Sequence, residues 1–265
     1  DGMLVETGSF NWLFNNEKEN SENIMFLGDK PTVRAYQEYF KFMWGKSHPI
    51  GKDSFYTGEL PELQGLYSPA MSERAISFNG ADLPAASFSP SGGTGANIVA
   101  AINAASRSVD VAVFSINLYA IVDALIAAHK RGVRVRVVTD YMQATGPSQA
   151  PGTKKMLESG IEIYVNDGHT DVNGDGNMHH KFGIFDGKLL QNGSFNWSFG
   201  AEARNFENSI FTTDKQVVAV FKKEFSKIFN SAREINLKTL ERVAQSQEGK
   251  PNSQDRAMPR PPSGN

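Results

Sequence analysis

The 265-residue sequence contains no cysteine. Without thiols, neither a disulfide framework nor a thiolate metal site can form. The sequence also lacks a strong excess of charge, because 27 Lys and Arg residues stand against 29 Asp and Glu residues, for a net charge of -2. This balance argues against a broadly basic nucleic-acid-binding surface, although it is compatible with a local basic groove.

Long apolar runs are missing as well. No stretch of 18 or more apolar residues is present, so the sequence predicts no membrane-spanning segment. No initiator Met and no signal segment stand at the N-terminus. Because we expect the true N-terminus to lie upstream, this lack carries no weight, and both a cytoplasmic and an exported location stay open. With 40% hydrophobic residues and 18 Phe, the chain has enough apolar material for one full domain and part of another.

The most informative stretch is residues 178–197, which predicts a β-hairpin. Side chains alternate along a strand, so His179 and Lys181 share one face. Asp186-Gly187 predicts a two-residue hairpin turn, after which Ser194 and Asn196 again share a face. One hairpin therefore presents an imidazole, an ammonium, a hydroxyl and a carboxamide to the same small volume. Such a set of donors suits an oxyanion.

The spacing within this hairpin resembles a known signature. It reads His179-x-Lys181-x4-Asp186-x6-Gly193-Ser194, and resembles the HKD motif of the phospholipase D superfamily. Asn196 and Glu207 also stand where that family carries active-site residues. The plainer alternative makes His179 an ordinary strand histidine and Lys181 a solvated lysine, and a second copy of the motif argues against it.

This other copy of the motif lies at the N-terminus and is the first of the two in chain order. Residues 1–12 repeat residues 186–197 at a constant offset of 185. The repeat continues through Asn20/Asn205, Glu22/Glu207, Asn23/Asn208 and Phe40/Phe225. The sequence thus predicts a tandem duplication whose first copy opens on the Asp of its motif, so that the matching His and Lys would fall before residue 1.

Two interpretations of this first copy remain open. The chain is either a fragment of a longer protein with an upstream HxK motif, or its first copy is degenerate and never had one. We favour the fragment, because a start inside a hairpin would expose a raw sheet edge. His48 is no substitute, since it follows the last predicted helix of the repeat.

Strands and helices alternate along most of the chain. Strands are predicted at 24–28, 109–116, 133–139, 161–165 and 206–212, and helices at 33–44, 96–106, 119–131, 153–159 and 215–229. This alternation predicts an α/β fold with a mixed, mostly parallel sheet flanked by helices. The glycines of residues 92–95 are not followed by Gly-Lys-[Ser/Thr], so no nucleotide cofactor is predicted.

The chain divides into four predicted parts. Residues 1–45 form the C-terminal part of a first phospholipase D-like domain, and residues 46–77 a linker rich in Gly, Pro, Ser and Glu. Residues 78–234 form a second phospholipase D-like domain with a complete motif. Residues 235–265 are a polar, Pro-containing tail that we expect to be disordered.

The resemblance also implies a set of site residues. Those in catalytic roles are His179, Lys181, Ser194, Asn196, Glu207 and Asp186. Those that would bind phosphate from the first copy are Ser9, Asn11 and Glu22, while Asp1, Gly8 and Gly193 would be structural. Glu22 and Glu207 would hold the imidazoles in the right tautomer, each across the pseudo-twofold between the copies.

The resemblance further implies a metal-independent phosphodiesterase that hydrolyses or transfers a phosphodiester through a phosphohistidine, with His179 as general acid and base and no cofactor. A phospholipid head group is the favoured substrate because the composition is not basic. A nuclease of the same chemistry and a non-catalytic binding module are the alternatives, and the oligomeric state is left open.

Residues 171–176 resemble the start of a calcium loop. They read Asp171-x-Asn173-x-Asp175-Gly176, but the twelfth position of the loop is Phe182 instead of a carboxylate. His169, His179 and His180 lie close by in the sequence, yet Lys181 supplies positive charge where a metal would sit. No metal is predicted, and residues 166–177 are interpreted as a polar loop at the rim of the site.

Overall fold

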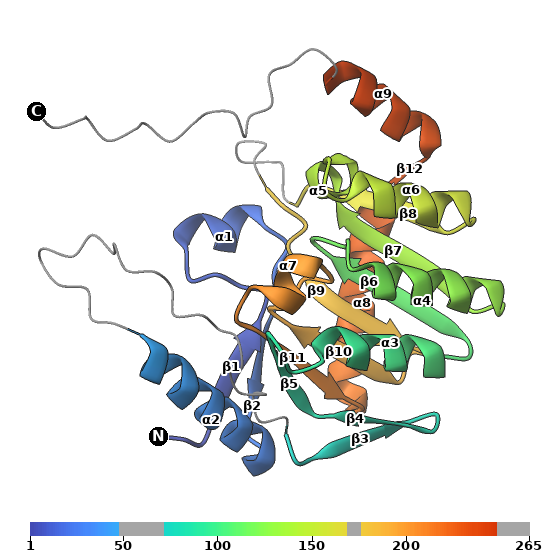
Figure 1. Cartoon of the computed structure of the whole chain (residues 1–265). Coiled ribbons are helices and arrows are strands. Elements are labelled where there is room, and N and C mark those ends of the chain that lie inside the picture. Colours follow the sequence, from blue (N-terminus) through green and yellow to red (C-terminus); the bar gives the residue numbers. More distant parts are fainter. Residues whose placement is uncertain (48–71, 169–175, 248–265) are drawn as a thin grey trace, which may run out of the picture.

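An eight-stranded sheet forms the centre of the molecule in the computed structural model, which describes residues 1–47, 72–168 and 176–247 (Figure 1). The strands lie in the order β12-β8-β7-β6-β9-β10-β11-β5. Their bounds are β5 (Ala86–Ser89), β6 (Ser108–Val113), β7 (Arg134–Asp140), β8 (Glu162–Asn166), β9 (Lys181–Phe185), β10 (Leu189–Gly193), β11 (Glu207–Thr212) and β12 (Arg233–Ile235).

The sheet is mixed, as predicted, but it is not mostly parallel. Only β6-β7 and β7-β8 are parallel pairs, and each of the other neighbouring pairs is antiparallel. Helical crossovers connect the parallel strands β6, β7 and β8, but a short hairpin can connect only antiparallel strands. The hairpin of β9 and β10 therefore makes this half of the sheet antiparallel. The α/β class with flanking helices is confirmed.

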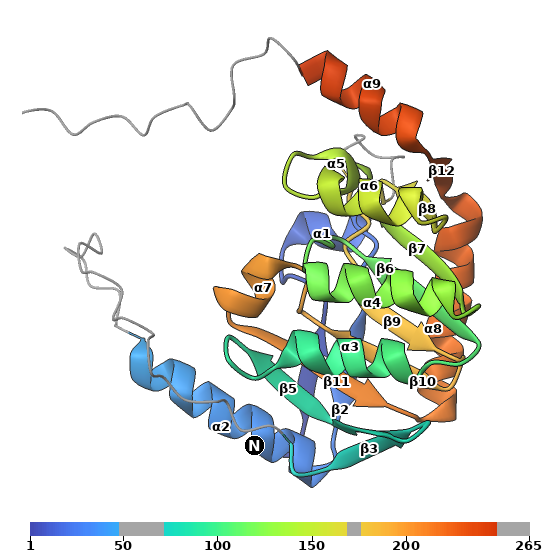
Figure 2. The ribbon, with the colours of Figure 1, turned by 45° about the vertical axis from the view of Figure 1, so that its right-hand side comes forward.

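Helices cover both faces of this sheet. Figure 2 shows α3 (Thr94–Ala104), α4 (Tyr119–Lys130) and α6 (Ala150–Glu158) on one face, while α8 (Lys215–Ser231) crosses the other. Alternation along β6 explains the two layers, because Val109, Val111 and Val113 face the first helical layer and Ala112 faces α8.

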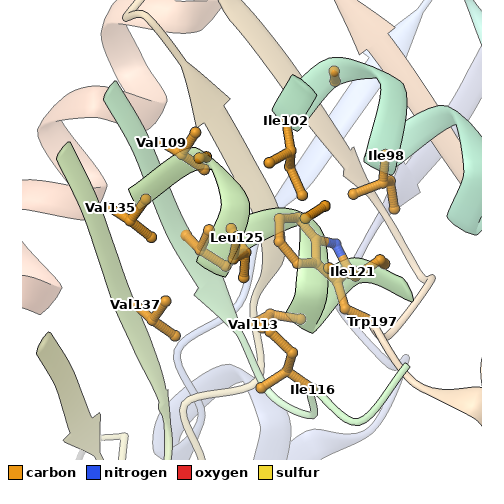
Figure 3. Close-up of a cluster of buried hydrophobic side chains, with 14 of the residues drawn as sticks. Ile98, Ile102, Val109, Val113, Ile116, Ile121, Leu125, Val135, Val137 and Trp197 are labelled. Atoms are coloured by element: carbon orange, nitrogen blue, oxygen red, sulfur yellow. The ribbon is translucent and has the colours of Figure 1, made fainter. Parts of the chain in front are cut away.

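Trp197 is buried at the centre of the first core. Figure 3 shows its indole among Ile98 and Ile102 of α3, Ile121 of α4 and Val113 of β6. The indole nitrogen donates to Gln191 Oε1 over 3.1 Å, so its polar atom is satisfied although the side chain is fully buried.

The first copy folds into β1 (Val5–Gly8), α1 (Phe14–Glu19), β2 (Ile24–Leu27) and α2 (Lys30–Lys46). β1 and β2 form an antiparallel pair beside the large sheet. α2 and α8 each have 17 residues, and both start after a capping aspartate, Asp29 and Asp214. The matched segments of the repeat therefore adopt matched elements.

Several short elements were not predicted. The hairpin of β3 (Ala75–Phe78) and β4 (Ala81–Pro84) overlaps the end of the expected linker, while residues 48–71 of that linker lie outside the described residues. α5 (Tyr141–Thr145) and α7 (Phe199–Ala203) are single short helices near the ends of strands. Turns of this length carry too few apolar residues to show a period.

The expected disordered tail is wrong for its first part. Ile235 of β12 is buried and pairs with Ile163 of β8, and α9 (Leu237–Gln247) follows directly. Two apolar side chains of this segment, Ile235 and Leu240, are buried, and the polar average of the tail does not reveal them. Residues 248–265 lie outside the described part of the chain.

Among the described residues, no helix combines the length and the apolarity that crossing a bilayer requires. In the same part of the chain, no group of three or more His, Cys, Asp or Glu side chains is placed to hold a metal ion. The Asp171–Asp175 stretch considered as a calcium loop lies outside the described residues, as does His169.

Candidate active site

The candidate site is built around His179, which precedes β9. His179 Nδ1 lies 2.7 Å from Glu22 Oε1, so a histidine of the second copy meets a carboxylate of the first. Backbone hydrogen bonds hold the two segments side by side, since His179 N donates to Ser21 O over 3.1 Å and Ser21 N donates to Asn177 O over 2.9 Å. The distance from His179 to Glu22 is therefore set by main-chain pairing and not by two side chains alone.

Glu22 is well placed to fix the imidazole. Its side chain is only 6% exposed, and its Oε1 also accepts from Asn20 Nδ2 over 3.1 Å. A carboxylate at Nδ1 favours the tautomer with the proton on Nδ1, which leaves the Nε2 lone pair of His179 for chemistry. The edge of the ring is supported by Phe114, with centroids 4.9 Å apart.

Lys181 lies beside this pair. Its ammonium donates to His179 O over 2.6 Å and sits 5.4 Å from the centre of the Phe114 ring. Burial lowers the pKa of Lys181 to about 7, although the carboxylates of Glu22 and Glu207 act to raise it. When it is protonated, Lys181 therefore places a positively charged donor beside His179.

Ser194 and Glu207 form the corresponding group of the second copy. Ser194 Oγ donates to Glu207 Oε2 over 2.6 Å and accepts from Asn208 N over 3.0 Å. The first copy has the same backbone contact, because Ser9 Oγ accepts from Asn23 N over 3.0 Å. The offset of 185 in the sequence thus becomes two matching half-sites in space.

The other expected site residues are less closely tied to this centre. Asn196 Oδ1 is buried without a hydrogen-bond partner among the described residues. Asn11 and Asp1 are exposed. The structure thus gathers His179, Glu22 and Lys181 closely, and no hydrogen bond joins Asn11 or Asp1 to them among the described residues.

Polar contacts that were not predicted from the sequence join the two copies. Thr7 Oγ1 donates to Asn208 Oδ1 over 2.6 Å, and Asn192 Nδ2 donates to Asn23 Oδ1 over 2.8 Å. These contacts are reciprocal, because Thr7 is the repeat counterpart of Asn192 and Asn23 that of Asn208. The identity of Asn23 and Asn208 in the repeat was the signal that could have pointed to them.

Two glycines allow the close approach on which both half-sites depend. A Cβ at Gly193 would lie 2.3 Å from Asn208 O, and one at Gly8 would lie 2.1 Å from Asn23 O. In each case the obstacle is backbone, which cannot move aside cheaply. The structural role that the resemblance implies for these glycines thus has a steric reason.

We expect Gly193→Ala to destabilise the protein by about 2 kcal/mol or more, because overpacking against fixed backbone costs about 1–3 kcal/mol. Gly200→Ala is the matched control, since a Cβ there meets nothing within 4 Å. Urea denaturation of both variants measures the effect. Equal unfolding midpoints for the two variants would contradict the steric reading.

Asp186 closes the hairpin as a structural residue. The register pairs Phe185 with Leu189, so the turn contains three residues instead of the predicted two. Asp186 has a φ of 53°, and its carboxylate accepts from Arg107 N over 2.7 Å and Ser108 N over 2.9 Å. Burial acts to raise the pKa of Asp186, but these backbone N–H groups outweigh it and lower the pKa to about 2.

We expect Asp186→Asn to lower the stability at pH 7 by about 1–3 kcal/mol, because buried N–H groups lose a charged acceptor. The folded-state pKa of Asp186 is about 2 and lies below the unfolded value, so its contribution is present above about pH 4 and is lost as the pH falls towards 2. Thermal unfolding between pH 2 and 7 should show the two curves converging in acid. The exposed Asp82→Asn should show no such convergence.

The fold and the paired half-sites define a class of protein. An α/β sheet carries an HxK strand whose histidine is held by a carboxylate and flanked by a buried lysine, in the spacing of the HKD motif. This chain belongs to the phospholipase D superfamily.

Known proteins of this superfamily are similar to part of the chain. Residues 98–229 match the family described as cardiolipin synthase, PLD-like domain. The chain is 36% identical over 129 residues to a mitochondrial cardiolipin hydrolase of Chlamydomonas reinhardtii, covering 49% of this chain and 54% of that protein. The chain therefore spans about half the length of this relative.

Two solved structures are similar as well. The phospholipase D family member Nuc from Salmonella typhimurium aligns with a TM-score of 0.52 and 28% identity, over 57% of this chain and 96% of that one. A phosphatidylserine synthase of Haemophilus influenzae aligns with a TM-score of 0.61 over 93% of this chain and 65% of that one. Its identity of 12% shows a shared fold alone.

Proposed function

We propose that this chain is the catalytic part of a phosphodiesterase of phospholipase D type that acts on a phospholipid head group, without a metal ion. The observation that carries the proposal is the His179–Glu22 contact of 2.7 Å, with the Lys181 ammonium beside it. A carboxylate-held imidazole can exchange a proton at Nε2, and a buried ammonium can bind a phosphate oxygen.

The proposed reaction has two displacements. An imidazole nitrogen attacks phosphorus while the bond to the leaving alkoxide breaks, and His179, which enters this step protonated on both ring nitrogens, gives the alkoxide its Nε2 proton and keeps the Nδ1 proton that faces Glu22. His179 Nε2 then removes a proton from water, whose oxygen attacks phosphorus and breaks the P–N bond. The Lys181 ammonium and the Asn196 amide nitrogen Nδ2 would bind the non-bridging oxygens as charge develops on them, and the Ser194 hydroxyl would join them once it no longer donates to Glu207.

This scheme needs a second imidazole, and the exposure of residues in the first copy supports a place for it. Identical residues that are buried in the second copy are exposed in the first. The pairs are Leu4 (62%) and Leu189 (0%), Trp12 (81%) and Trp197 (0%), Phe26 (65%) and Phe211 (2%), and Phe40 (57%) and Phe225 (1%). The difference supports a missing covering segment rather than a degenerate copy.

A cavity of about 610 Å³ lies at the same place, between β1 and α2 and beside Glu207 and Asn208. Its lining includes Tyr36, the repeat counterpart of Phe221. In the second copy Phe221 packs on Phe182 of the HxK strand, with ring centroids 5.0 Å apart. We therefore propose that an HxK strand occupies this cavity and that Glu207 holds its histidine as Glu22 holds His179.

A phospholipid is favoured over a nucleic acid for two reasons. The net charge of -2 offers no general attraction for a polyanion. The similar protein of Chlamydomonas reinhardtii is named for the hydrolysis of cardiolipin. The particular head group depends on loops that vary freely on this scaffold.

The test uses two preparations of the chain. One is residues 1–265, and the other carries a copy of residues 176–185 directly before Asp1, which restores the spacing of the second motif. Each is incubated without added metal with vesicles of phosphatidylcholine, phosphatidylglycerol and cardiolipin, and separately with single-stranded DNA. Release of choline, glycerol or phosphatidic acid is compared with that of a His179→Ala control.

We expect lipid cleavage that depends on His179 and that rises in the extended chain. Cleavage of DNA alone would replace the lipid proposal with a nuclease. If neither substrate is cut by either preparation, the non-catalytic binding module becomes the better explanation. Equal lipid cleavage by both preparations would overturn the proposed place of the second HxK strand.

A further inference from the structure

His180 is a buried histidine to which the proposed reaction gives no role. It follows His179 in the chain and has no solvent exposure. Its Nδ1 lies 3.0 Å from Asn23 Nδ2, its Nε2 lies 3.7 Å from Glu224 Oε1, and its ring meets the Phe182 ring edge-on at 5.2 Å. A fully buried imidazole that faces the other copy of the repeat needs an explanation.

The hydrogen bonds around Asn23 fix the proton on this imidazole. Asn23 Oδ1 accepts from Asn192 Nδ2 over 2.8 Å, so the amide nitrogen of Asn23 points towards His180. Because that nitrogen is a donor, His180 Nδ1 must accept, and the ring proton is on Nε2, on the side of Glu224. The contact therefore requires a neutral His180.

The position of this contact links it to the site. Asn23 follows Glu22, and His180 follows His179, so the pair Asn23–His180 lies next to the pair Glu22–His179. Asn23 N also donates to Ser9 Oγ over 3.0 Å. Any shift of Asn23 would move the carboxylate that orients the proposed general acid and base, because the two residues share a peptide bond.

We propose that His180 is a positioning residue: through Asn23 it holds the segment that carries Glu22, and so fixes the orientation of the His179 imidazole. The inference rests on the proposed function of His179. The counterpart Asn208 has a matching contact, since its Oδ1 accepts from Thr7 and Tyr36 as the Oδ1 of Asn23 accepts from Asn192.

Protonation of His180 would break this arrangement. An Nδ1 proton would face the Asn23 amide, so that two donors met. Burial lowers the pKa of His180, whereas the carboxylates of Glu224 and Glu22 raise it and the Lys181 ammonium lowers it. The charged groups around the ring therefore come from α8, from the first copy and from β9.

Two substitutions separate the hydrogen bond from the packing. His180→Asn keeps an acceptor at the same number of bonds from Cβ as Nδ1, whereas His180→Leu keeps a similar volume and removes the acceptor. Phe182→Leu is the matched control, since it loosens the same cluster without touching Asn23. The readouts are lipid hydrolysis as kcat and KM, and the ¹⁵N-histidine NMR signal of the His179 Nδ1 proton.

We expect His180→Leu to lower kcat by about tenfold to a hundredfold with little change in KM, because misplacing a catalytic group costs that much. The His179 Nδ1 proton should exchange faster in this variant, and His180→Asn should restore both readouts. Phe182→Leu should lower the melting temperature and keep the NMR signal.

Any other pattern overturns the proposal. This holds if His180→Leu keeps the protected Nδ1 proton, if His180→Asn behaves like His180→Leu, or if Phe182→Leu loses the signal to the same extent. The NMR comparison does not depend on turnover. A chain without His179-dependent hydrolysis would therefore refute the proposed function and still decide the role of His180.

Discussion

His179→Ala should reduce phosphodiester hydrolysis by between about 10² and 10⁴-fold, the contribution that positioned acid–base groups make. The reason is local, because His179 is the imidazole that Glu22 holds at 2.7 Å and that lies beside the Lys181 ammonium. The adjacent His180 does not replace it, since His180 points to Asn23 and Glu224 instead. Steady-state hydrolysis of phospholipid vesicles measures the loss as kcat/KM.

His129→Ala is the matched control, because it removes an imidazole from the last turn of α4 near Gly160, apart from the site. It should retain full activity. If His179→Ala keeps more than about a third of the activity of the unchanged chain, the acid–base role of His179 is wrong.

Lys181→Met should lower hydrolysis by about 10² to 10³-fold, the cost of removing one preorganised donor to a developing anion. Activity of the unchanged chain should also fall as the pH rises past 7, because burial lowers the pKa of Lys181 to about 7 and the ammonium is lost above it. Lys181 is fully protonated, and so able to bind phosphate as an ammonium, only at pH values well below 7. A pH profile of kcat/KM measures this descending limb.

Lys181→Arg separates the charge from its titration. Arginine stays protonated throughout this range, so the part of the limb that belongs to residue 181 should vanish, although the different shape of the guanidinium lowers the overall rate. The exposed Lys188→Met, in the turn of the same hairpin, serves as control. An unchanged descending limb in Lys181→Arg would assign the titration to another group.

Much of the fold follows from local patterns. Gly132 ends α4 with a φ of 86°, and the Val and Ile runs that follow Gly132 and Gly160 became β7 and β8. The direction of the strands was harder to predict, because β9 joins the sheet beside β6 and not beside β8, its predecessor in the chain. Neighbours in a sheet depend on long-range packing that no short window of sequence contains.

Site residues that are close in the sequence could be predicted, whereas contacts between distant segments could not. His179 and Lys181 are two residues apart, so their shared face follows from strand geometry. The Asn23–His180 contact joins residues that are 157 positions apart, and the sequence around neither residue indicates that the two segments meet. The identity of Asn23 and Asn208 in the repeat indicates that Asn23 matters, but it does not predict the contact with His180.

The same separation has a consequence for how the molecule acquires its activity. Glu22 and His179 are also 157 positions apart, and they meet only after the intervening chain has folded. Contacts of such long range close slowly, because loop entropy must be overcome before they form. During synthesis the first copy must wait for nearly the whole second domain to leave the ribosome. Recovery of turnover after dilution from denaturant should therefore lag behind recovery of helical circular dichroism.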